Sequence, residues 1–228
     1  MKHENGAVVL VSGGLDSTVL LHHVAKELER TPIHALSFDY GQRHVRELAC
    51  AKWQAESVGV AEYRVIELAY LRDVLSGAST LMADGPPVPD LKDVDDSDTD
   101  QPSTYVPNRN MMLLSIASAY AEAHGITDVY YGAQAQDEYG YWDCTTDFLE
   151  RINAVLALNR RDAITIHAPQ VKASKADNVR RGIDLGVDFS HTWSCYRGED
   201  IPCGTCPTCV ERNSAFDAVE MRDPLLGK

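Results

Sequence analysis

Two adjacent glycines flanked by hydroxyl side chains follow an apolar run near the start of the chain. The stretch reads Ser12-Gly13-Gly14-Leu15-Asp16-Ser17-Thr18 and comes directly after the strand-like residues 7–11. Glycines let main-chain N–H groups approach an anion closely, and the first turn of a following helix adds its positive end. Asp16 suits a helix cap or a Mg²⁺ ligand. The stretch predicts a phosphate-binding loop; a plain capped turn is the simpler alternative.

Four of the six cysteines lie close together near the C-terminus, with the spacing C-x7-C-x2-C-x2-C. Four thiolates in one short segment suit tetrahedral Zn²⁺ and leave no open coordination position, so the metal would be structural. An iron–sulfur cluster and free reduced cysteines are the alternatives. Of the other two, Cys50 is expected in the core, and the role of Cys144 is left open. The predicted zinc ligands are Cys195, Cys203, Cys206 and Cys209.

A further polar group, Asp39-Tyr40-Gly41-Gln42-Arg43-His44, follows the second apolar run. At the C-terminal end of a parallel strand these side chains could hold adenine, ribose and phosphates. A polar loop that caps the next helix is the alternative interpretation. We expect Asp39, Gln42 and Arg43 to bind nucleotide.

Strand-like and helix-like segments alternate along the chain, which predicts a parallel sheet of about five strands with helices on both faces. Ligands bind beyond the C-terminal ends of strands in such sheets, where the polar loops fall. We expect one α/β domain over residues 1–228, with a small zinc module at about 190–213. The predicted strands are 7–11, 33–38, 63–68, 128–133 and 163–168, and the predicted helices are 17–28, 45–57, 109–123, 146–158 and 175–185.

Composition narrows the class of protein. The formal net charge of −13 argues against a broad electrostatic grip on nucleic acid. No apolar run is long enough to span a bilayer, and the first residues do not read as a signal peptide, so the cytoplasm is expected. Residues 82–104, with four prolines and seven aspartates, are expected to form a mobile surface loop or lid. Their spacing lacks the glycine and the final glutamate of a calcium loop.

The glycine loop resembles the S-G-G-x-D-S motif of the pyrophosphatase-loop family, and no lysine follows its glycines as in a G-K-[S/T] loop. The segment Asp39 to His44 is similar to one subfamily, the 7-cyano-7-deazaguanine synthases. The likeness extends to Thr104-Tyr105-Val106-Pro107-Asn108-Arg109-Asn110, to Gly140-Tyr141-Trp142-Asp143-Cys144-Thr145 and to the cysteine segment. The resemblance implies a sheet of the adenine-nucleotide alpha-hydrolase-like type, bound ATP and Mg²⁺, and a homodimer.

The resemblance also implies the reaction. A 7-carboxy-7-deazaguanine carboxylate attacks the ATP α-phosphorus, ammonia displaces AMP to give the amide, and a second ATP activates the amide, which then forms the nitrile. The loop would hold the departing pyrophosphate, through Ser12, Gly13, Gly14, Leu15, Asp16, Ser17 and Thr18. Asp16, Arg109 and Lys175 are the expected catalytic residues. A guanine-like base needs an acceptor for its N–H groups, which Asp143 or Asp137 could supply. The expected substrate contacts are Tyr105, Arg109, Asn110, Gly132, Asp137, Tyr141 and Asp143.

The chain departs from the subfamily pattern at three positions: Trp142 replaces a proline, Thr145 an arginine and Asn108 a glycine. The first two lie in the expected substrate loop and leave the product open. A paralogue that adenylates the same acid, passes it to another amine, perhaps on a protein, and stops at the amide is therefore the alternative. A third interpretation is a nucleotide-binding or zinc-dependent interaction module without turnover, which the intact S-G-G-L-D-S loop disfavours. Modification of tRNA by a related enzyme is disfavoured by the acidic charge.

Overall fold

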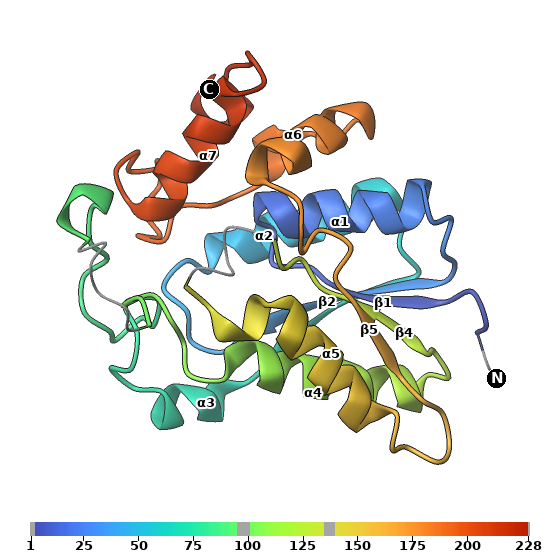
Figure 1. Cartoon of the computed structure of the whole chain (residues 1–228). Helices are drawn as coiled ribbons and strands as arrows, with labels where there is room; N and C mark the ends of the chain where they lie inside the picture. The colour runs from blue at the N-terminus through green and yellow to red at the C-terminus, as the bar shows by residue number, and fades with distance from the viewer. Residues whose placement is uncertain (1–2, 95–100, 135–139, 228) are drawn as a thin grey trace.

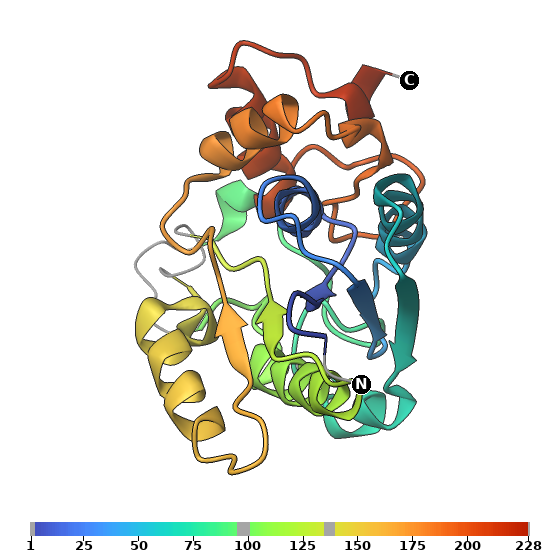
Figure 2. The same cartoon turned by 90° about the vertical axis from the view of Figure 1, so that its right-hand side faces the viewer.

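Five parallel strands form one sheet in the order β3-β2-β1-β4-β5 (Figures 1 and 2). The computed structural model describes residues 3–94, 101–134 and 140–227. Within them the predicted parallel α/β sheet is confirmed, although its fourth and fifth strands are shorter than the sequence pattern indicates. The strands are β1 (Ala7–Leu10), β2 (Ile33–Asp39), β3 (Glu62–Glu67), β4 (Asp128–Tyr130) and β5 (Thr165–His167).

Helices cover both faces of the sheet, as predicted: α1, α2 and α6 lie on one side, and α4 and α5 lie on the other (Figure 1). Helices α3 and α7 fall outside the predicted elements. None of the described helices combines the length and apolar character needed to cross a bilayer. The helices are α1 (Leu15–Lys26), α2 (Arg46–Val58), α3 (Ala69–Val74), α4 (Arg109–Ala123), α5 (Thr146–Leu156), α6 (Lys175–Asp184) and α7 (Pro207–Asp217).

Alternation along the central strand explains the two layers of core. Successive side chains of a strand point to opposite faces, so Val8 packs with Leu114 of α4, whereas Val9 packs with Leu20 of α1. All of these side chains are buried. A strand covered on both faces reads as a continuous apolar run, which is the pattern that the sequence shows over residues 7–11.

The connections reverse direction beside β1. The chain passes from β1 through α1 to β2 on one side, while β4 pairs with the other edge of β1. In doubly wound sheets this switch point opens a crevice beyond the C-terminal strand ends. The predicted phosphate loop leaves β1 at this point, so the topology places it in the crevice.

Residues 82–94, which were expected to belong to a mobile surface loop or lid, pack against the cysteine segment. Val88 lies in the same buried cluster as Cys195 and Cys206. Asp90 pairs with Arg197, with 2.5 Å between Oδ1 and Nη2, and accepts a hydrogen bond from Thr205. Residues 95–100 of the expected lid lie outside the described residues.

A buried ion pair ties α7 to the end of the chain. The Arg212 guanidinium donates to both carboxylate oxygens of Asp223, at 2.6 and 2.9 Å, and each side chain is 3 % exposed. Arg212 also donates to the Thr192 hydroxyl and to the Phe189 carbonyl. One guanidinium thereby joins α7, the C-terminal residues and the segment that leads to Cys195.

Breaking this pair should destabilise the protein strongly. Asp223→Ala leaves the Arg212 charge buried without its carboxylate, which should lower the free energy of unfolding by about 3–5 kcal/mol. Denaturant unfolding measures it, and Asp217→Ala at the exposed end of α7 is the control. Equal stability of the two variants would contradict the assigned role.

Candidate active site

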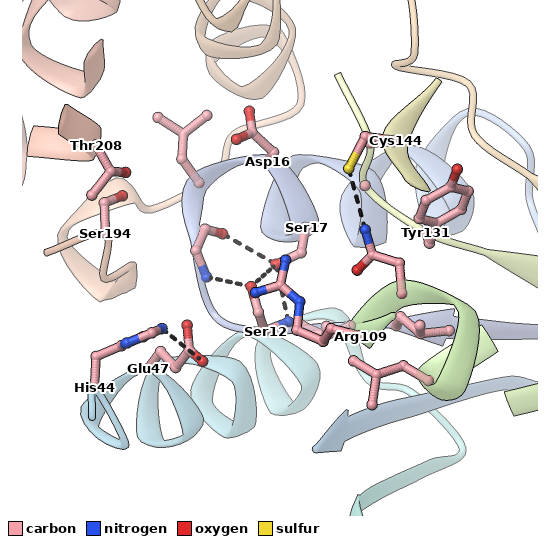
Figure 3. Close-up of a pocket in the computed structure, with 18 of the residues that line it drawn as sticks. Ser12, Asp16, Ser17, His44, Glu47, Arg109, Tyr131, Cys144, Ser194 and Thr208 are labelled. Carbon is pink, nitrogen blue, oxygen red and sulfur yellow. Dashed lines mark hydrogen bonds and ion pairs between the residues drawn. The ribbon is translucent and has the colours of Figure 1, made fainter. Parts of the chain in front are cut away.

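A cavity of about 300 Å³ lies beyond the C-terminal ends of β1, β2 and β4 (Figure 3). That volume falls within the range of small-molecule sites. Its walls come from distant parts of the chain: the phosphate loop, the start of α2, the start of α4, and the segment that carries the cysteines. The polar lining residues are Ser12, Asp16, Ser17, His44, Glu47, Thr104, Arg109, Asn110, Lys175, Ser194, Thr208 and Glu211.

Hydroxyl groups brace the predicted phosphate loop from within. The Ser12 N–H donates to Ser17 Oγ at 3.1 Å, and the two hydroxyl oxygens lie 3.0 Å apart. The Gly14 N–H donates to Ser12 Oγ at 3.2 Å. Helix α1 begins at Leu15, two residues earlier than predicted, so Asp16 and Ser17 lie in its first turn. Ser12, Gly14, Leu15, Asp16 and Ser17 line the cavity, whereas Gly13 and Thr18 lie behind it.

Gly13 allows the loop to press against α2. Its φ is +90°, and a Cβ atom there would lie 2.0 Å from the Glu47 carbonyl oxygen. A side chain at this position would therefore be both strained and without room. The Gly13 carbonyl accepts the Trp193 N–H at 2.9 Å, which ties the loop to the cysteine segment. The second helix and the C-terminal segment thus both fix the loop.

Charged groups from three helices meet at Asp16. Its Oδ1 accepts from Asn178 of α6 at 2.8 Å, and Lys175 Nζ lies 3.7 Å from Oδ2. Lys175 also donates to Glu211 of α7 at 2.9 Å. The sequence predicts Asp16 and Lys175 as site residues, and the structure brings them together at the cavity. Glu211 adds a second carboxylate beside them.

The predicted nucleotide ligands after β2 do not line the cavity. Gln42 is fully buried; it accepts the Tyr40 N–H at 2.9 Å and donates to the Phe38 carbonyl at 2.8 Å. Arg43 donates to carbonyls of residues 80–86, and Asp39 accepts the Gly41 N–H. These side chains hold the shape of the loop, and their direct contact with ATP stays a prediction.

Tyr40, His44 and Glu47 occupy the position where those ligands were expected. Burial raises the pKa of Glu47 to about 8, although the Arg109 charge opposes the rise. Burial lowers the pKa of His44 to about 4, so the imidazole is neutral near pH 7. His44 Nε2 lies 3.5 Å from Glu47 Oε1.

Of the predicted substrate residues, Arg109, Asn110, Gly132 and Tyr141 line the cavity. Arg109 donates to the Tyr40 hydroxyl at 3.4 Å. Asp137 lies outside the described residues. Asp143 is buried behind the lining, where it accepts the Asn110 N–H at 3.1 Å, and burial raises its pKa. In this position it orients the start of α4.

The two replacements in this loop also have local roles. Thr145 is the N-cap of α5 and accepts the Phe148 N–H at 3.1 Å. The Trp142 indole donates to the Tyr105 hydroxyl at 2.7 Å, and the three residues Tyr105, Trp142 and Thr145 are absent from the cavity lining. Trp142 and Thr145 therefore make local hydrogen bonds and are not part of the cavity lining.

Several lining residues escaped the sequence analysis. Glu47 had a usable signal, because it follows His44 by three residues at the start of a helix and so shares its face. Ser194, Thr208 and Glu211 had none, because only tertiary packing returns the cysteine segment to the cavity. Figure 3 shows Ser194 and Thr208 across the cavity from Ser12.

The four clustered cysteines can hold a metal ion. Their sulfur atoms all lie within 4.8 Å of one another, and three of the residues are buried. Sulfurs about 3.8 Å apart are what a tetrahedral zinc–thiolate site requires, given its usual bond length. The N–H groups of Cys203 and Cys206 donate to the sulfurs of Cys195 and Cys203, which favours thiolates.

Fold and site together define an α/β protein that presents a pyrophosphatase-type loop at the switch point of a parallel sheet. The chain belongs to the family described as queuosine biosynthesis protein QueC, whose model matches residues 6–220. It is 41% identical over 222 residues to a 7-cyano-7-deazaguanine synthase of Marinobacter nauticus, covering 97% of this chain and 96% of the relative. A synthase of the same name from Hahella chejuensis is 39% identical over 221 residues, covering 97% and 92%.

Solved structures share the fold at low sequence identity. The NMN synthetase of Francisella tularensis matches with a TM-score of 0.53 at 16% identity, covering 96% of this chain and 79% of that one. The U34-tRNA thiolase NcsA of Methanococcus maripaludis matches with a TM-score of 0.51 at 15% identity, covering 96% and 66%. At such identities the likeness extends to the fold alone.

We expect one zinc per chain at the cysteine cluster. Cys206→Ser should lose the metal together with thermal stability, because formation of such a site is coupled to folding. Elemental analysis and melting curves measure both, with Cys50→Ser as the control, because Cys50 packs beside the cluster but is not one of its four predicted ligands. Retained zinc, or an unchanged melting temperature in the metal-free variant, would contradict a structural role.

Proposed function

We propose that this protein converts 7-carboxy-7-deazaguanine and ammonia into 7-cyano-7-deazaguanine, with ATP split to AMP and pyrophosphate at each of two activations. One observation carries the proposal: the braced S-G-G-L-D-S loop opens onto a cavity of small-molecule size. Membership of the family and the relatives named 7-cyano-7-deazaguanine synthase support this substrate.

The phosphate side of the cavity suits a pyrophosphate leaving group. The first turn of α1 presents N–H groups and the positive helix end to the cavity. Asp16 offers a carboxylate oxygen that would hold Mg²⁺, which when bound neutralises phosphate charge. Lys175 lies beside it and can neutralise phosphate oxygens directly. Catalysis then rests on positioning and on charge stabilisation.

The opposite side of the cavity suits the deazaguanine acid. Arg109 and Asn110 begin α4 and face the cavity, so they can bind a carboxylate and bring its oxygen toward the α-phosphorus. Tyr141 lines the same wall and offers an aromatic surface. Gly132 lies close to Ser17, which brings the end of β4 against the phosphate loop.

The alternative, an amide-stopping paralogue that uses another amine, was motivated by Trp142 and Thr145. Both side chains make hydrogen bonds away from the described cavity lining, so these two residues do not favour the alternative. Mass analysis of the product distinguishes the two, because only the nitrile has lost the amide oxygen. A homodimer and a cytoplasmic setting, where ATP and ammonia are available, belong to the same proposal.

Cleavage of ATP should depend on the acid and on Asp16. We expect AMP and pyrophosphate in the presence of 7-carboxy-7-deazaguanine and little turnover without it. Asp16→Ala should lower the rate by roughly 100-fold or more, because a carboxylate that places the phosphates is lost. Asp184→Ala on the exposed surface of α6 is the control. Release of ADP and phosphate instead would refute the proposal.

A further inference from the structure

Ammonia poses a problem of proton transfer for the proposed reaction. At neutral pH it is present mostly as ammonium, whose nitrogen has no lone pair for attack on an acyl-adenylate. An enzyme that uses it therefore gains from a cavity carboxylate that attracts the cation and accepts one of its protons. The phosphate-binding and acid-binding residues described above do not provide that group.

Among the residues that the structure describes, three carboxylates line the cavity: Asp16, Glu47 and Glu211. The first and the last share Lys175 between them. Among the described residues, no lysine or arginine lies within ion-pair distance of Glu47, whose neighbour is His44. Glu47 is therefore the lining carboxylate that can receive a cation without displacing a lysine.

The position of Glu47 fits a site for a small cation. It lies in the first turn of α2, and its backbone carbonyl abuts Gly13 of the phosphate loop. Its side chain is 11 % exposed, and the apolar residues Leu36 and Phe38 line the same cavity. Figure 3 shows it beside His44 on the α2 side of the cavity.

The charged groups that act on Glu47 and its surroundings come from several elements. His44 is neutral near pH 7, because burial lowers its pKa to about 4. Arg109 of α4 is the positive group that acts on Glu47 across the cavity. The Gln42 side chain is hydrogen-bonded to Glu47. The other titratable groups that act on Glu47 or on its surroundings include Tyr40 and Arg43 after β2, Tyr63 of β3, Arg46 and Cys50 of α2, Cys195, and Arg212 of α7.

We propose that Glu47 is the ammonium site of this enzyme: its carboxylate binds ammonium at the inner end of the cavity and accepts a proton from it. The inference rests on the proposed function. It assigns the nucleophile's entry point to the α2 side of the cavity, next to the loop that holds the departing phosphates.

The step balances. Ammonium gives one proton to the Glu47 carboxylate, and ammonia is left. The nitrogen lone pair forms a bond to the acyl carbon, and the bond from that carbon to the AMP oxygen breaks with its electron pair leaving on AMP. The amide nitrogen loses one further proton to solvent, and Glu47 returns its proton to solvent before the next ammonium binds.

Hydroxylamine separates this role from a structural one, since it is mostly unprotonated at neutral pH and needs no proton acceptor to attack. Glu47→Gln keeps the shape of the side chain and removes its charge. It should lower conversion by ammonia roughly 100-fold, while hydroxamate formation from the same acyl-adenylate changes less than about threefold. Glu56→Gln, on an exposed face of the same helix, is the matched control. Glu47→Asp should recover part of the ammonia reaction.

The pH profile gives a second measurement, which holds even if a variant folds poorly. The pKa of Glu47 is raised to about 8, so the accepting carboxylate is the minor form below that pH and the major form above it. With the ammonium concentration held constant, the wild-type rate should therefore increase as the pH passes through about 8. This increase should be larger than the increase in the concentration of free ammonia. The Glu47→Gln rate should follow free ammonia alone.

Three outcomes would overturn the inference. Equal losses with ammonia and hydroxylamine would assign Glu47 to the fold or to activation, and unchanged use of ammonia would leave it no role. If Glu47→Gln loses the acid-dependent exchange of pyrophosphate into ATP, Glu47 acts in the activation of the acid and not on ammonium. Failure of that exchange in the wild type, by contrast, would contradict the proposed function itself, on which this inference rests.

Discussion

Gly13 has a φ of +90° and approaches α2 so closely that a Cβ atom would lie 2.0 Å from the Glu47 carbonyl oxygen. This contact between a strand-to-helix loop and the backbone of the next helix determines the geometry of the site. The first turn of α1 lines the cavity from one side of this contact, and the side chains of His44 and Glu47 line it from the α2 side. A larger residue would separate the loop from α2 and alter both.

The C-terminal segment completes the site from outside the sheet. Trp193 donates its N–H to Gly13, and Glu211 of α7 reaches Lys175 beside Asp16. The cysteine cluster lies between these two contacts in the sequence. A metal bound there would hold the segment that positions both, so a structural ion can govern phosphate binding without touching a phosphate.

Sequence patterns predicted the features that are contiguous in the chain. The alternation of elements predicted the parallel sheet, and the glycine loop and the cysteine spacing predicted two sites whose residues the structure brings together. Gln42 and Arg43 show where such prediction stops. Their polar side chains suggested ligands, but Gln42 bonds to backbone groups of its own loop and Arg43 to carbonyls of residues 80–86, a choice that depends on backbone conformation.

Asp143 and Glu47 are two carboxylates whose positions differ from what local sequence patterns suggested. Asp143 was expected to face the base, yet it accepts the Asn110 N–H behind the cavity lining. Glu47, which carries no motif of its own, faces the cavity because α2 begins where it does. The three-residue spacing of His44 and Glu47 indicates that the two side chains lie together. Which of two carboxylates faces a cavity depends on the packing of helices that are far apart in the sequence.

The central claim is that an oxygen of the substrate attacks the α-phosphorus while the loop holds the departing pyrophosphate. It is tested most directly by giving the enzyme 7-carboxy-7-deazaguanine with ¹⁸O in both carboxylate oxygens and weighing the products. The account predicts that each AMP carries one labelled oxygen, the first from the acid and the second from the amide, and that the pyrophosphate carries none. Label in pyrophosphate or in inorganic phosphate, or unlabelled AMP, would contradict it.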